Sequence, residues 1–291
     1  MKKSLLVAAL IAGFAGAASA DTSVTLYGRV DGGIEYQQFK GTDPGTGESI
    51  KGTKSGMANG IMGGNRWGLK GAEDLGNGLQ AVFVLESGFN LNDGSGSGFS
   101  RQSTVGLKSS SWGQLDFGRQ TSVSSKYLAN VASPFGADWG QASIGSAFSA
   151  INSVRYDNMI MYQTPSFSGF QFGVGYSFNA SGNQQFKVSG GDEPNTRAWT
   201  TGLRYGSGPL EVALSYDQFK SPEDGTSTDV GVNGVTVKSW NLAGAYDFDV
   251  VKLHAGFGQT RDGWFKTVSA LRAYSAPGIQ TPRANSNDTW A

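Results

Sequence analysis

Hydrophobic and polar residues alternate with a period of two in many short segments of this chain. The segment 170–178, "FQFGVGYSF", places five large apolar side chains on one face and only Gln, Gly and Ser on the other. Segments at 24–34, 210–217 and 240–248 repeat the pattern. This period is typical of β-strands, whose successive side chains point to opposite faces of a sheet. Helical periodicity is weak after the first twenty residues, so the pattern predicts an all-β fold.

Short and long connections alternate between the predicted strands. Short links lie at 71–78, 108–113, 164–169, 206–209 and 247–250. Long polar links lie at roughly 39–60, 90–99, 120–151, 179–196, 219–237 and 260–288. In an up-and-down antiparallel sheet this order sends every long loop to one side, as in outer-membrane barrels. We therefore expect a transmembrane β-barrel, with about eleven strands and the start of a twelfth at "DTWA".

The apolar face of these strands is rich in aromatic residues, which could form the interfacial girdles of a membrane barrel. The alternative is the packed core of a soluble sandwich. A closed barrel pairs every backbone amide in hydrocarbon, and a sandwich gives no reason for the strict order of short and long links. The sequence thus favours the barrel.

The N-terminal segment reads "MKKSLLVAALIAGFAGAASA", a positive start, a short apolar run and small residues at the cleavage spacing. It predicts a signal peptide over residues 1–20. The chain has 23 basic and 23 acidic residues. Removal of Lys2 and Lys3 leaves 21 against 23, a net charge of −2, which gives no case for nucleic-acid binding. There is no cysteine, so an exported chain of this kind has no disulfide framework.

Several blocks resemble the general diffusion porins of Gram-negative bacteria, above all those of beta-proteobacteria. They are "SVTLYGRVDGGI", "NRWGLKGAEDLGNGLQAVFVLESGF", "RQSTVGLKSSSWGQLDFGRQ" and "NSVRYDNMIMYQTPSFSGFQFGVGYSF", in that order. The resemblance implies a sixteen-stranded homotrimeric barrel over residues 21–291, placed in outer-membrane lipid and passing small hydrophilic solutes and ions passively. It also implies that the third long link, about 120–151, folds inward and narrows the pore. Unusual length alone suggests a functional loop there.

Strand parity predicts which side chains face the lumen, because charges on the lipid face are costly. The residues predicted to face the lumen are Arg29, Asp31, Arg66, Lys70, Arg155 and Asp157. Those predicted to face lipid are Trp67, Leu69, Val154 and Tyr156. Charged positions and inward positions therefore mostly coincide.

The porin resemblance adds Arg66, Arg101 and Arg155 as wall arginines that face the constriction loop. Arg101 shares the parity of lipid-facing residues, so either a bulge reverses the register or the arginine lies above the membrane band. On the loop, Asp138 and Lys126 are the candidate charges. A basic wall facing a weakly acidic loop predicts weak to moderate anion preference.

An alternative interpretation is that the arginines pair with acids such as Glu86 and Asp157 and only stiffen the wall. His254 is the one histidine, and the chain offers none of the usual catalytic or metal-binding constellations. We therefore predict no enzymatic activity, no cofactor and no metal. The alternatives left open are a structural or adhesin barrel and a barrel enzyme, which bilayer conductance would distinguish from a porin.

The chain ends at Ala291, four residues into the predicted twelfth strand. In the family that it resembles, the chain continues to a terminal phenylalanine. We expect a C-terminally truncated barrel.

Overall fold

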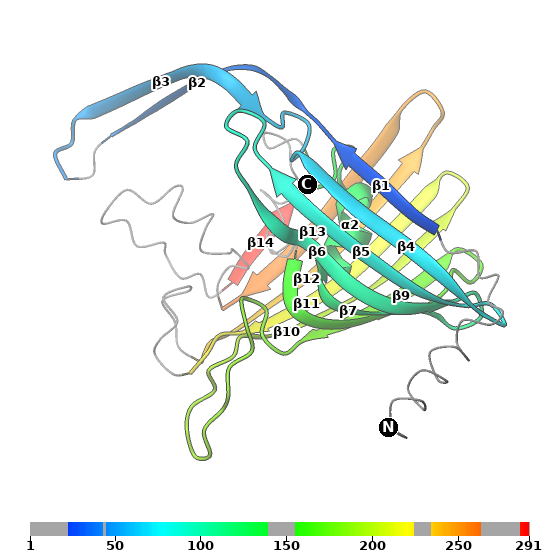
Figure 1. The fold of residues 1–291 in the computed structure, drawn as a ribbon. Helices are drawn as coiled ribbons and strands as arrows, with labels where there is room; N and C mark the ends of the chain where they lie inside the picture. Colours follow the sequence, from blue (N-terminus) through cyan, green and yellow to red (C-terminus); the bar gives the residue numbers. More distant parts are fainter. Residues whose placement is uncertain (1–22, 43–44, 139–154, 224–233, 263–285, 291) are drawn as a thin grey trace, which may run out of the picture.

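A computed structural model describes residues 23–42, 45–138, 155–223, 234–262 and 286–290. Twelve strands form one antiparallel sheet, in the order β1-β4-β5-β6-β7-β8-β9-β10-β11-β12-β13-β14 (Figure 1). They are β1 (Ser23–Arg29), β4 (Arg66–Gly76), β5 (Leu79–Phe89), β6 (Gly96–Ser109), β7 (Gly113–Thr121), β8 (Arg155–Gln163), β9 (Phe170–Ser177), β10 (Arg197–Ser207), β11 (Leu210–Lys220), β12 (Thr236–Asp247), β13 (Lys252–Arg261) and β14 (Ser286–Trp290). The predicted all-β, up-and-down architecture is confirmed. The predicted signal peptide, residues 1–20, lies outside the described residues.

The predicted alternation of short and long connections is also confirmed. Two residues join β4 to β5, and they are Asn77 and Gly78, both with positive φ (54° and 73°). This is the backbone that a two-residue hairpin turn requires, and Asn-Gly is its preferred sequence. At the last long link the chain returns as β14, which pairs with β13 from Phe257↔Trp290 to Arg261↔Ser286. The segment expected to begin a twelfth strand therefore does so.

The first long connection differs from the expected polar loop at 39–60. β1 ends at Arg29, and a separate two-stranded ribbon follows, formed by β2 (Gly32–Thr42) and β3 (Ser49–Asn59). The ribbon projects away from the main sheet (Figure 1). The expectation of one strand over 24–34 is wrong for the same reason. A ribbon exposed on both faces needs no apolar face, so the polar residues of 39–60 gave no sign of strand pairing.

The two faces of the sheet differ as the alternation predicts. On β11 and β12, Leu214 and Leu242 are 46% and 45% exposed, whereas the intervening Ala213 and Ala243 are at most 2% exposed. A helix, α2 (Val123–Ala132), covers the small-residue face and contacts β9 to β13. In Figure 1 it lies inside the curve of the sheet. Within the described part of the chain, no helix is long and apolar enough to cross a bilayer.

Helix α2 has clear start and stop signals. The Ser122 side chain accepts a hydrogen bond from the Ser125 amide, which is the usual N-cap arrangement. Ser133 has extended backbone at the C-cap, and Pro134 follows. A proline at this point cannot continue the helix. The first part of the predicted constriction loop is therefore helical, and its remainder, 139–154, lies outside the described residues.

Three register shifts interrupt the main sheet; one lies beside the β4–β5 turn, and the other two are bulges that change which side chains face inward. Between β7 and β8 the pairing steps from Gly118↔Met159 to Gln120↔Tyr156, so two residues of β8 oppose one of β7. Tyr156 consequently faces the interior and is 2% exposed, against our expectation that it faces lipid. A bulge changes which side chains of a strand face inward. Val154, expected to share that face, lies outside the described residues.

Candidate functional site

Five arginines lie together inside the sheet near the long-link ends of its first strands. We call Arg29, Arg66, Arg101, Arg119 and Arg155 the arginine cluster. β1, β4, β6, β7 and β8 bring them together, because neighbouring antiparallel strands with alternating link lengths place all long-link ends on one side. Arg66 lies within electrostatic range of Arg29 and Arg101, and Arg155 within range of Arg66, Arg101 and Arg119. The three arginines that the resemblance singled out are thus neighbours.

Arg101 reaches the interior through the second bulge. The pairing of β5 with β6 steps from Glu86↔Gln102 to Gly88↔Ser97, so four residues of β6, including Arg101, oppose one of β5. Arg101 Nε donates to Glu86 Oε1 at 2.6 Å, and the Tyr27 hydroxyl donates to Glu86 Oε2 at 3.0 Å. Of the two arrangements expected for Arg101, the structure has the bulge.

Arg29 joins the wall to the loop that follows α2. Its Nη1 and Nη2 atoms donate to the two carboxylate oxygens of Asp138 at 3.0 and 3.1 Å. This bidentate geometry is the strong form of an arginine–carboxylate pair. Gly63 makes room for it, since a Cβ there would overlap the guanidinium. The Gly63 and Met62 amides donate to Asp31, which lowers the pKa of the Asp31 carboxyl.

Arg119 was missed by the sequence reasoning. Its Nη1 atom donates to Asp157 Oδ1 at 2.5 Å, and Asp157 Oδ2 accepts from the Gly182 amide at 2.7 Å. Arg119 is the one residue of β7 opposite the bulge in β8. A bulge leaves no mark in hydrophobic periodicity. The one sequence signal is an asparagine at position 158, a residue type that adopts positive φ more readily than most, and its φ in the structure is 47°.

The arginine cluster retains positive charge. Three of its members form ion pairs, with Glu86, Asp138 and Asp157. Across the described residues, Arg66 and Arg155 have no acid within ion-pair distance, and Arg155 Nε is buried without a hydrogen-bond partner. Counting Asp31 as well, five arginines face four carboxylates, an excess of one positive charge. Of the three wall arginines to which the pairing alternative applied, only Arg101 forms an ion pair among the described residues.

Lys126, the second loop charge expected at the site, lies elsewhere. It is on α2, and the charged group that acts on it is Asp116 of β7, not the arginine cluster. Burial lowers the pKa of its ammonium group. Of the two loop charges, the structure brings only Asp138 to the arginines.

The wall opposite the cluster is shaped to receive α2. A Cβ on Gly202 would lie 3.1 Å from Val123 Cγ1, and one on Gly173 would lie 2.9 Å from the Tyr127 hydroxyl oxygen. The Arg204 guanidinium lies 4.9 Å from the centroid of the Tyr127 ring, in the range of a cation–π contact. Glycine and alanine on these strands thus leave the space that the helix fills.

His254 faces the interior, toward α2. Its Nδ1 atom is 3.0 Å from the carbonyl oxygen of Val131, in the last turn of α2. Among the described residues, no three of His, Cys, Asp and Glu are grouped to hold a metal ion. The lone histidine therefore contacts the loop helix.

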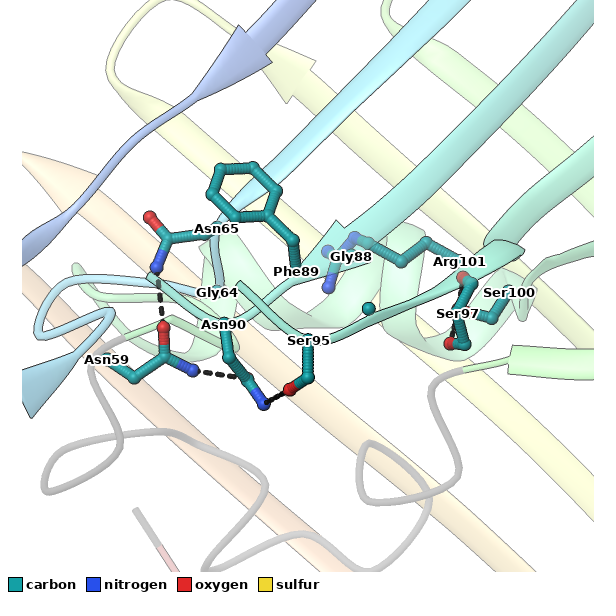
Figure 2. Close-up of a pocket in the computed structure, with 11 residues that line it drawn as sticks. Asn59, Gly64, Asn65, Gly88, Phe89, Asn90, Ser95, Ser97, Ser100 and Arg101 are labelled. Atoms are coloured by element: carbon teal, nitrogen blue, oxygen red, sulfur yellow. Dashed lines mark hydrogen bonds between the residues drawn. The ribbon is translucent and has the colours of Figure 1, made fainter. Parts of the chain in front are cut away.

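An open polar pocket lies beside Arg101 (Figure 2). A chain of amides crosses it: Asn65 Nδ2 donates to Asn59 Oδ1 at 2.8 Å, and Asn59 Nδ2 donates to Asn90 Oδ1 at 2.5 Å. Asn90 Nδ2 then donates to Ser95 Oγ at 2.8 Å. These bonds join the end of the β2–β3 ribbon to β4 and to the β5–β6 link. Arg101 therefore lines an open pocket that is rich in hydroxyl and amide groups.

Comparison with known proteins identifies close relatives. The family model described as Gram-negative porin matches residues 6–285. An outer membrane porin protein of Bordetella pertussis is 54% identical over 277 residues, which cover 91% of this chain and 71% of that protein. Outer membrane porin protein 32 of Delftia acidovorans is 34% identical, covering 95% of this chain and 76% of that protein.

The solved structures give the same result. The anion-selective porin from Comamonas acidovorans superposes with a TM-score of 0.62 and 29% identity, covering 83% of this chain and 68% of that one. The order of strands, the helix inside the sheet and these relatives agree: the chain belongs to the family of Gram-negative porins.

Proposed function

We propose that this outer-membrane porin passes small hydrophilic solutes and ions passively, with a weak to moderate preference for anions. The observation that carries the preference is the arginine cluster, in which Arg66 and Arg155 have no ion pair among the described residues. A pore lined by excess positive charge attracts anions and repels cations. The relative from Comamonas acidovorans, which is named an anion-selective porin, supports the same reading.

The proposed selectivity region consists of wall and loop residues. On the wall are Arg29, Arg66, Arg101, Arg155 and Asp157, and the loop contributes Asp138. We assign the segment 120–151 as the loop that narrows the pore, with Lys126 acting from a distance. Residues 1–20 would serve as the export signal and residues 21–291 as barrel. The position of α2 inside the curve of the sheet supports the loop assignment (Figure 1).

Assembly and activity follow from the family. The porin resemblance implies a homotrimer in the lipid of the outer membrane. Porins are channels, and we assign no catalytic role to any residue of this chain. The rival functions, a structural or adhesin barrel and a barrel enzyme, would not give stepwise ohmic currents in a planar bilayer.

The test removes the two unpaired arginines. At ~8 Å through water, with screening by about 0.1 M salt, each charge changes the energy of a passing ion by about 0.2 kcal/mol, favourably for an anion and unfavourably for a cation. Loss of both should therefore lower the anion-to-cation permeability ratio roughly fivefold. Reversal potentials in a salt gradient would be measured for the protein and for the Arg66→Ala/Arg155→Ala variant.

The matched control removes the same charge from outside the site. Lys238 and Arg261 are exposed, at the long-link ends of β12 and β13, and form no ion pair among the described residues. The Lys238→Ala/Arg261→Ala variant should keep the reversal potential of the unaltered protein. Cation preference of the unaltered protein, or equal reversal potentials in both double variants, would contradict the proposal.

A further inference from the structure

Asp217 of β11 is a fully buried carboxylate on the interior wall behind α2. Its Oδ2 atom accepts a hydrogen bond from the hydroxyl of Ser124, the second residue of the helix. Thr200, its cross-strand neighbour on β10, accepts a bond from the Ser124 amide at 3.3 Å between N and Oγ1. Two strands of the wall therefore hold the first turn of α2 through one residue.

The carboxylate has no cationic partner within ion-pair distance among the described residues, and its Oδ1 atom is buried without a hydrogen-bond partner. A buried carboxylate is costly unless other groups stabilise it. The stabilising groups are the Ser124 hydroxyl and the positive end of the helix dipole on α2, together with the Thr200 side chain on β10. Asp217, whose burial is energetically unfavourable, therefore lies where the loop helix begins.

Toward its C-terminal end, α2 packs against small side chains of the wall. Leu128 and Val131 pack against Ala213, Ala243 and Ala245. Methyl-sized neighbours give close packing but few features that fix the position of a helix along its axis. The polar contacts at the two ends, Asp217 with Ser124 and His254 with Val131, fix that position together with the contact of Arg204 with the Tyr127 ring.

We propose that Asp217 is a positioning residue that fixes α2 in the channel and thereby keeps the open pore at a constant width. The proposal rests on the proposed channel function. The chain runs six residues from the end of α2 to Asp138, which pairs with Arg29 on the opposite side of the site. Displacement at the start of the helix would therefore reach the arginine cluster.

The experiment compares Asp217→Ala and Asp217→Asn as single channels in planar bilayers. The alanine variant lacks the acceptor, so open-channel noise and brief closures should rise severalfold. The asparagine variant keeps one oxygen for the Ser124 hydroxyl and should restore quiet currents. Glu211→Ala is the control, because Glu211 lies on the same face of β11 near its other end, where it pairs with Lys252.

Ser124→Ala gives the same test from the loop side and leaves every strand unaltered, should Asp217→Ala fail to insert. It should be as noisy as Asp217→Ala. Quiet currents in Asp217→Ala or Ser124→Ala, or an asparagine variant as noisy as alanine, would overturn the positioning role. Failure of the proposed function itself is distinct, because the unaltered protein would then show no ohmic steps.

Discussion

At the scale of single residues, Glu86 holds together two parts of the wall that the sequence separates. Its side chain is 6% exposed and binds Arg101 from the bulge of β6 and Tyr27 from β1. A buried charge pair contributes little net stability, but removal of one partner leaves the other uncompensated. Glu86 is therefore a structural partner of the arginines as well as a negative charge near the pore.

Replacement of Glu86 by alanine should have two measurable effects. Arg101 would lose its buried partner, and the free energy of unfolding should fall by about 3 kcal/mol. Anion preference should increase, because one negative charge leaves the cluster. Urea titrations of the protein folded into lipid vesicles, together with reversal potentials, measure both.

The exposed ribbon supplies a control for this change. Glu35 on β2 pairs with Lys54 at 2.9 Å in an exposed position. Exposed pairs contribute little, so Glu35→Ala should leave stability and selectivity unchanged. Equal effects of the two substitutions would show that Glu86 has no special part in the cluster.

At the scale of elements, the sequence predicts regular strands well and irregular ones poorly. Period-two alternation gives the outward faces of β9, β11 and β12, because each strand keeps one register from end to end. It fails at Tyr156, Arg119 and Arg101, since a bulge reverses parity without changing composition. Arg101 was predicted as a site residue from the porin resemblance and not from periodicity.

Periodicity also failed to predict the ribbon β2–β3 and the helix α2. The large apolar residues of the ribbon, such as Ile34 and Phe39, are exposed, and those of α2 lie within one helix of 10 residues. Neither pattern is long enough for periodicity to identify the element. What orders α2 is tertiary: the glycines and alanines of β9 to β13 leave a surface that matches it. A single sequence does not reveal that distant match.

The match between α2 and β10 predicts an effect of side-chain size. A Cβ on Gly202 would already lie 3.1 Å from Val123 and 3.3 Å from Tyr127. Gly202→Val should therefore push the first turn of α2 toward the pore axis, at a cost of about 1–3 kcal/mol for overpacking. Single-channel conductance should fall.

Gly206 on the same strand is the matched site, because a Cβ there meets nothing within 4 Å. Gly206→Val should conduct like the unaltered protein, since it adds the same side chain away from the helix. A Gly202→Val channel with unchanged conductance would contradict the close fit of α2 to the wall.

At the scale of the whole molecule, wall and loop have separate tasks. The twelve-stranded sheet supplies a fixed frame whose outward face is apolar and whose inward face is small or charged. The loop helix and the residues after it touch that frame on both sides, at β9 to β13 and at Arg29. The loop segment therefore contacts opposite sides of a frame whose wall carries the arginines.

The β2–β3 ribbon stands apart from this arrangement. Its strands pair only with each other within the described residues, and β1 pairs directly with β4 beneath it. A short peptide tag inserted after Gly47, at the tip, should leave single-channel conductance unchanged while binding its antibody on intact cells. A tagged channel with altered conductance would show that the tip communicates with the pore.

The ribbon thus places an exposed surface at a distance from the pore-lining residues. Hydrogen bonds among Asn59, Asn65 and Asn90 hold the base of the ribbon. We therefore expect a substitution at the tip to leave the surroundings of Arg101 unaltered. Antibodies or phages that bind the tip would therefore select for sequence variation in a part of the protein that takes no part in solute passage.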